Sequence, residues 1–111
     1  TINISTVDFD GQAAPTAVVD THQLTLVATS AASIVITGDA DLELTNTGNV
    51  RATLIDGSDM TGALEATLFN TAAAGTLTGG SGADTLTASD FVAITAGGDT
   101  LNGGAGNDVL N

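Results

Sequence analysis

Cysteine, tryptophan and tyrosine are absent from this chain of 111 residues, and Arg51 is its only lysine or arginine. The lack of cysteine excludes disulfides and thiolate metal ligands, but it does not fix the redox compartment. No apolar run approaches 18 residues, so no transmembrane helix is expected, and no basic segment resembles the start of a signal peptide. Such a composition suits an extracellular protein that relies on bound metal instead of disulfides.

Negative charge dominates the chain. Thirteen Asp and Glu residues give a net charge of −12. Nucleic acid and anionic membrane surfaces are therefore poor partners on electrostatic grounds. Because so many carboxylates repel one another, bound divalent cations are a natural means of reducing the repulsion. Charged residues make up only 13% of the chain and hydrophobic residues 42%, which argues against an acidic disordered tail.

Short β-rich runs recur along the chain between clusters of Gly, Asn, Asp and Ser, and no segment shows a convincing helical period. We therefore predict an all-β fold, a right-handed parallel β-helix or β-solenoid that passes into a β-roll. The solenoid segment is expected at residues 1–72 and the roll at 73–111, and a small β-sandwich over residues 1–60 is the alternative. The predicted strands are Thr1–Val7, Leu24–Ala28, Ser33–Thr37, Asp41–Thr45, Arg51–Ile55, Ala63–Phe69, Gly75–Thr78, Thr85–Thr87, Phe91–Thr95, Thr100–Asn102 and Val109–Asn111.

Two nine-residue segments, Gly79–Thr87 and Gly103–Asn111, follow one template, G-G-x-G-x-D-x-U-x, where U is a large aliphatic residue. Glycine permits turns that are closed to other residues and lets backbone carbonyls crowd around an ion. The Asp supplies the anionic oxygen that calcium prefers, and the x-U-x tail is a minimal strand with one inward side chain. Two complete copies therefore predict a stacked, calcium-binding roll.

The spacing of the acidic residues predicts which turns share an ion. If each nonapeptide contributes one strand, turns 18 residues apart stack on the same edge. Asp90 and Asp108 are 18 apart and are expected to share one edge, whereas Asp99 is expected to face Asp84 on the other. One well-formed site is thus predicted between the turns that end at Asp84 and Asp99. A second, less complete site would join Asp108 to Asp90 or to a further rung.

The order of three segments, Ile55–Leu64, Thr76–Thr87 and Gly98–Asp108, resembles the RTX-containing surface proteins of Gram-negative bacteria, including S-layer proteins of the Caulobacter type. The first of these segments favours the S-layer proteins over RTX toxins or proteases. The resemblance covers roughly residues 50–111. It implies type I secretion and folding outside the cell, at the bacterial surface, with Ca²⁺ as the cofactor.

The resemblance also implies a set of calcium ligands. Together with those expected from spacing, the candidate carboxylates are Asp84, Asp99, Asp108 and Asp90. The candidate backbone ligands are Gly79, Gly80, Ser81, Gly82, Gly97, Gly103, Gly104, Ala105 and Gly106.

The implied function is a calcium-binding structural module of a secreted bacterial surface layer, in which ion binding is coupled to folding and assembly. The alternative is a repeat module of a large RTX adhesin that binds cell surfaces. The expected partners are other copies in a surface lattice or neighbouring rungs of a longer parent chain, of which this sequence is expected to be a fragment. Lipopolysaccharide or another cell-surface glycan would be contacted through another domain, and no direct membrane insertion is expected.

Two other kinds of activity are not expected. Only His22 and Arg51 could act as a base or a cation, and they lie in unrelated segments, so the chain is predicted not to be an enzyme. Ice binding would need a flat ladder of threonines. The two segments Thr76–Thr78 and Thr85–Thr87 are expected on opposite faces, so no such ladder is predicted.

Three further acidic groups are predicted to be structural or solvated. Asp8–Gly11 is expected to form a capped turn. Asp39, Asp41 and Glu43 alternate along a strand and are expected to form a solvated face. Asp56–Asp59 is expected to be a plain turn.

Overall fold

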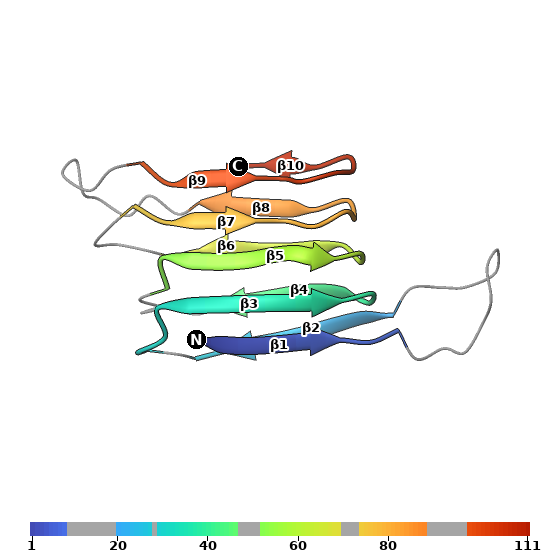
Figure 1. The fold of residues 1–111 in the computed structure, drawn as a ribbon, viewed down its shortest axis with the longest axis horizontal. Helices are drawn as coiled ribbons and strands as arrows, with labels where there is room; N and C mark the ends of the chain where they lie inside the picture. The colour runs from blue at the N-terminus through green and yellow to red at the C-terminus, as the bar shows by residue number, and fades with distance from the viewer. Residues whose placement is uncertain (9–19, 28, 47–51, 70–73, 89–97) are drawn as a thin grey trace.

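The computed structural model describes residues 1–8, 20–27, 29–46, 52–69, 74–88 and 98–111, which form ten β-strands (Figure 1). Among these described residues, no helix is long and apolar enough to cross a membrane. The strands are β1 (Ile2–Thr6), β2 (Thr21–Leu26), β3 (Ser33–Gly38), β4 (Asp41–Asn46), β5 (Leu54–Met60), β6 (Leu64–Leu68), β7 (Thr76–Thr78), β8 (Thr85–Ala88), β9 (Thr100–Asn102) and β10 (Val109–Leu110).

The strands build two parallel five-stranded sheets. The odd-numbered strands pair in the order β1-β3-β5-β7-β9 and the even-numbered strands in the order β10-β8-β6-β4-β2. One odd strand and the even strand that follows it form a rung, and the rungs stack in chain order (Figure 1). The regular part of this β-solenoid makes about three turns of roughly 22 residues. The prediction of a parallel β-solenoid is confirmed, and the sandwich alternative is wrong because β1, β3 and β5 already pair in parallel.

The core lies between the two sheets, because alternate side chains of each strand point inward. Parallel register stacks Ile34 on Ile55 and Ile55 on Leu77, and all three are fully buried. Burying each of these side chains contributes roughly 2 kcal/mol. Met60, the only methionine, joins this core at the end of β5 with 1% exposure. The buried cluster is Ile34, Ile36, Leu42, Leu44, Ala52, Ile55, Met60, Leu64, Ala66, Leu68, Leu77 and Leu86.

The last rung buries little apolar surface. β9 has three residues and β10 has two. Leu101 is only partly buried, and Val109 and Leu110 are 51% and 49% exposed. These values contrast with the complete burial of Leu77 and Leu86 one rung earlier.

The prediction for β5 was wrong. The Asp56–Asp59 segment is not a turn, since it lies within β5 and pairs with β3 across a register shift between Val35 and Thr37. Within this segment the backbone N–H of Ser58 donates to Asp56 Oδ1 at 3.1 Å. β2 also begins three residues before the predicted Leu24. The predicted strand Phe91–Thr95 lies outside the described residues.

Candidate calcium-binding edge

Both nonapeptide turns lie on one side of the solenoid. From β3 onward, short turns at residues 39–40, 61–63, 79–84 and 103–108 connect each odd strand to the next even strand. We call this side, on the right of Figure 1, the short-turn edge. The two nonapeptide turns are direct neighbours, because Thr85 pairs with Val109 and the Ala105 N–H donates to Gly80 O at 3.0 Å.

Asp84 joins two rungs at this edge. Its side chain is 1% exposed, although it carries a carboxylate. Oδ1 accepts a hydrogen bond from the backbone N–H of Leu64 in the preceding rung at 2.7 Å. Oδ2 accepts one from the N–H of Gly80 in its own turn at 2.8 Å. The two bonds compensate part of the cost of burying this carboxylate.

Asp108 repeats the bond between rungs one rung later, although its side chain is only half-buried. Its Oδ1 accepts a hydrogen bond from the backbone N–H of Asp84 at 3.0 Å. The two acidic residues therefore occupy neighbouring positions along the short-turn edge, where their like charges repel.

The environment of Asp84 changes its acidity. Burial raises the pKa of this carboxyl group, hydrogen bonds from Leu64 and Gly80 oppose the rise, and the charges of Asp108 and Asp41 add to it. A raised folded-state pKa means that the charged form is disfavoured by folding. The stabilising contribution of Asp84 is therefore fully present below its unfolded pKa and is lost as pH rises through the higher folded pKa.

A pH series in chelator is expected to show this effect. In EDTA, the unfolding free energy of the wild type is expected to rise relative to that of Asp84→Asn as pH falls from neutral through the carboxyl range. The Asn side chain does not titrate, so subtracting the two series isolates Asp84 from the other acidic residues. Urea unfolding at each pH measures the difference. A difference that is flat, or that falls toward low pH, would contradict the expectation.

Backbone carbonyls crowd together at the short-turn edge. A Cβ at Gly80 would overlap the carbonyl oxygen of Met60, and a Cβ at Gly104 would overlap that of Gly80. A Cβ at Gly82 would likewise overlap the carbonyl oxygen of Gly62. Glycine lets successive turns approach this closely, and Gly104 also adopts a positive φ of 86°.

This donor set fits calcium. Carboxylate and carbonyl oxygens are the ligands that Ca²⁺ prefers, and six to eight of them are usual. Among the described residues, no group of three or more His, Cys, Asp or Glu side chains is placed to hold a metal. A calcium site at this edge would therefore take most of its oxygens from the glycine-rich backbone.

The predicted pairing of the turns was wrong. Asp99 does not face Asp84, because it precedes β9 on the opposite edge, where its Oδ1 accepts the N–H of Gly75 at 2.8 Å. Asp84 instead neighbours Asp108. The physical reason is the length of a turn of the solenoid. Thr76 pairs with Thr100, 24 residues on, whereas two nonapeptides would span 18.

Asp99 nevertheless has a feature that suits a cation. Its Oδ2 is buried and has no hydrogen-bond partner among the described residues. A buried carboxylate oxygen without a donor is costly unless a partner is supplied. The candidates Asp90 and Gly97 lie outside the described residues.

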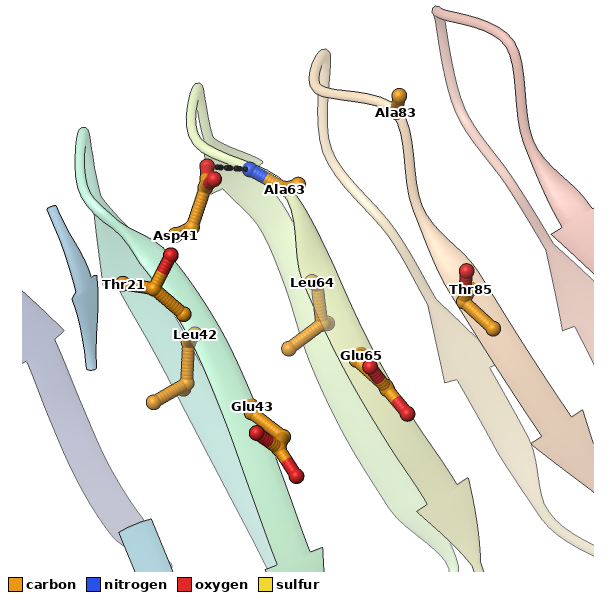
Figure 2. Close-up of a pocket in the computed structure, with 9 residues that line it drawn as sticks. All are labelled: Thr21, Asp41, Leu42, Glu43, Ala63, Leu64, Glu65, Ala83 and Thr85. Carbon is orange, nitrogen blue, oxygen red and sulfur yellow. Dashed lines mark hydrogen bonds between the residues drawn. The ribbon is translucent and has the colours of Figure 1, made fainter. Parts of the chain in front are cut away.

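Asp41 was assigned to a solvated face, but it also belongs to the short-turn edge. Its Oδ1 accepts the N–H of Ala63 at 2.7 Å, so it bridges two rungs as Asp84 does (Figure 2). Glu43 on β4 and Glu65 on β6 lie further along the strands and line one pocket together with Asp41 (Figure 2). The register pairs these two glutamates directly. The signal that could have identified the bridging role is the position of Asp41 immediately after a short turn.

Two pairs of threonines on neighbouring strands were not predicted. Thr76–Thr78 and Thr85–Thr87 do lie in different sheets, as expected. On the outer face of the even-numbered sheet, however, Thr25 pairs with Thr45, and Thr67 pairs with Thr87. The adjacent column carries the paired Glu43 and Glu65.

Comparison with known proteins found no match, since no protein-family model, curated protein or solved structure was similar to this chain.

Proposed function

We propose that this chain is a calcium-binding structural module of a secreted bacterial surface-layer protein of the RTX type. One observation carries the proposal. Two glycine-rich turns with the same template stack directly on each other, and their acidic residues, Asp84 and Asp108, are joined by a 3.0 Å hydrogen bond from backbone to carboxylate. Like charges placed so close on a chain of net charge −12 favour a bound cation.

The residues that would hold calcium are the carboxylates of Asp84 and Asp108 and the backbone carbonyls of Gly79–Gly82 and Gly103–Gly106. Asp99, with its unpartnered Oδ2, would contribute to a separate site on the opposite edge. When bound, calcium would supply the positive charge that offsets the carboxylates, and its binding free energy would add to folding stability.

The placement in a secreted surface layer rests on the resemblance of residues 50–111 to RTX surface proteins and on the acidic, cysteine-free composition. A solenoid built from stacked rungs of the same two-strand architecture suits a structural role, because each rung needs contacts only with its neighbours for stability. Neighbouring rungs of a parent chain or other copies in a lattice would be the partners.

Calcium titration tests the proposal. Isothermal calorimetry on EDTA-treated protein is expected to show calcium binding, and Asp84→Asn is expected to weaken it at least about tenfold because the site loses a charged ligand. Asp59→Asn removes the same charge from an exposed residue of β5 and is the matched control, with affinity expected near that of the wild type.

Circular dichroism provides a second readout. The β-sheet signal is expected to decrease in EDTA and to recover when calcium is added in excess. Magnesium at the same concentration is expected to be much less effective, because it demands a smaller octahedral site. A spectrum that ignores both chelation and calcium, together with a flat calorimetric titration, would sink the proposal.

A further inference from the structure

The outer face of the even-numbered sheet holds two like charges directly opposite each other. The parallel register pairs Glu43 of β4 with Glu65 of β6. Like charges in such positions destabilise a sheet. The described residues contain no lysine or arginine to offset them, because Arg51, the only one in the chain, lies outside these residues. A local cost that the fold itself does not offset is typical of a functional surface.

This glutamate pair lies on a side of the solenoid and not at one of its ends. β4 and β6 are interior strands of the sheet, flanked by β2 and β8. Leu42 and Leu64, the neighbours of the glutamates in sequence, are buried in the core, whereas Glu43 is half-buried and Glu65 is exposed. Further rungs stacked at either end would therefore leave the two carboxylates open to solvent.

Two pockets adjoin at the glutamate pair, and both are lined by Glu43 and Glu65. The first has a volume of about 170 Å³ and includes Asp41, nearer the short-turn edge. The second has a volume of about 190 Å³ and includes Thr45 and Phe69, further along the strands. Figure 2 shows the two glutamate side chains extending side by side in the same direction. Each pocket is comparable in size to one long side chain.

The polar and aromatic groups of these pockets suit an organic cation. The side-chain amide of Gln23 donates a hydrogen bond to Glu43 Oε2 at 2.6 Å, which orients that carboxylate without neutralising it. Phe69 lines the second pocket together with both glutamates. Aromatic rings attract cations, and guanidinium groups both stack on rings and bind carboxylates through paired hydrogen bonds. Arginine and lysine side chains therefore match this face.

We propose that this face, defined by Asp41, Glu43, Glu65 and Phe69, docks an extended basic segment of a partner protein, whose alternate Arg or Lys side chains enter the two pockets. The first pocket includes residues 41–43 of β4 and the second residues 43–45, an offset of two residues. In an extended peptide, side chains two residues apart point the same way at a spacing of ~6.6 Å. The net charge of −12 would speed the encounter with such a partner.

Fluorescence anisotropy with a labelled peptide, Thr-Arg-Thr-Arg-Thr, tests the proposal on the full chain in the presence of calcium. The wild type is expected to bind this peptide, and Glu43→Gln combined with Glu65→Gln is expected to weaken binding at least about tenfold. The matched control combines Asp56→Asn with Asp59→Asn, which removes the same charge from β5 in the other sheet. Its affinity is expected to change less than about twofold, since only long-range attraction is lost. No binding by the wild type, or equal weakening by both double variants, would overturn the proposal.

A charge reversal gives a second readout. Glu65→Lys places a cation opposite Glu43, so its melting temperature is expected to rise while peptide binding falls at least about tenfold. Unchanged peptide binding in this variant would show that the pair has no part in docking. An oligomer of glucosamine carries ammonium groups on a sugar backbone. If it binds at least about tenfold more tightly than the peptide, the occupant is a cationic glycan and the peptide proposal is rejected.

The docking face is separate from the glycine-rich turns proposed to bind calcium, so the two proposals fail independently. Calcium binding without peptide binding would keep the calcium module and reject the docking face. Peptide binding that depends on the glutamate pair, in a chain that does not bind calcium, would do the reverse.

Discussion

Replacing Ile55 with alanine is expected to lower the free energy of unfolding by about 3 kcal/mol, whereas the same change at the adjacent Leu54 is expected to cost less than about 1 kcal/mol. Ile55 is fully buried and is stacked between Ile34 and Leu77. Alanine there leaves a cavity in the middle of a continuous apolar column. Leu54 pairs with Ser33 and lies on the outer face, where its side chain is only half buried.

Urea unfolding in EDTA, monitored by circular dichroism, measures both variants without a contribution from calcium. The pair is a stringent control because both variants replace a large aliphatic residue with alanine at neighbouring positions of the same strand. Similar losses for the two variants would show that β5 does not hold the register described, since a slip by one residue exchanges the inward and outward sets.

The second large effect is expected at a glycine of the short-turn edge. Gly80→Ala is expected to destabilise the chain by about 2–3 kcal/mol, because its Cβ would overlap the carbonyl oxygen of Met60 and force two rungs apart. Calcium affinity is expected to fall at least about tenfold, since the displaced turn carries the proposed carbonyl ligands. Gly98→Ala is the control, because a Cβ there meets nothing within 4 Å.

Thermal unfolding and calorimetric titration of the two glycine variants distinguish a packing requirement from a general entropic effect. Glycine-to-alanine changes at unstrained positions stabilise slightly through the unfolded state. Gly98→Ala is therefore expected to be neutral or stabilising, within about 1 kcal/mol. An equally neutral Gly80→Ala would mean that the turns do not approach each other as described.

Much of the fold could be predicted from strand patterning. The runs near Ser33, Asp41, Ala63 and Thr76 lie within a residue or two of the observed strands, because alternation and turn residues mark them clearly. The error at Asp56–Asp59 has a specific cause. Asp, Gly and Ser are strong turn formers, but here Gly57 faces the inside of the solenoid, where a Cβ would meet the side chain of Leu64. Packing against a neighbouring strand overrode the local preference.

The positions of the candidate turns were predicted from the sequence, but the arrangement of these turns was not. The nonapeptide template singled out Asp84, Asp108 and the glycines before them, but the nine-residue spacing placed the two aspartates on opposite edges, whereas they are neighbours in the structure. Which turns meet depends on the number of residues in a full turn of the solenoid, and nine-residue repeats alone give the wrong number. Asp99 was consequently placed on the wrong edge. The position of Asp41 immediately after a short turn hints at its bridging role, but the partner, Ala63, lies in the next rung and depends on how the rungs stack.

The single methionine can serve as a built-in probe of local opening in this solenoid. Met60 is the only sulfur atom in the chain, and its side chain is 1% exposed beside the short-turn edge. Peroxide oxidises thioethers to sulfoxides, and a buried one is reached only when the structure around it opens. Oxidation adds one oxygen atom, a mass increase of about 16 daltons. The rate at which this heavier form accumulates in mass spectra would therefore report how often β5 opens from its neighbours, with no added label.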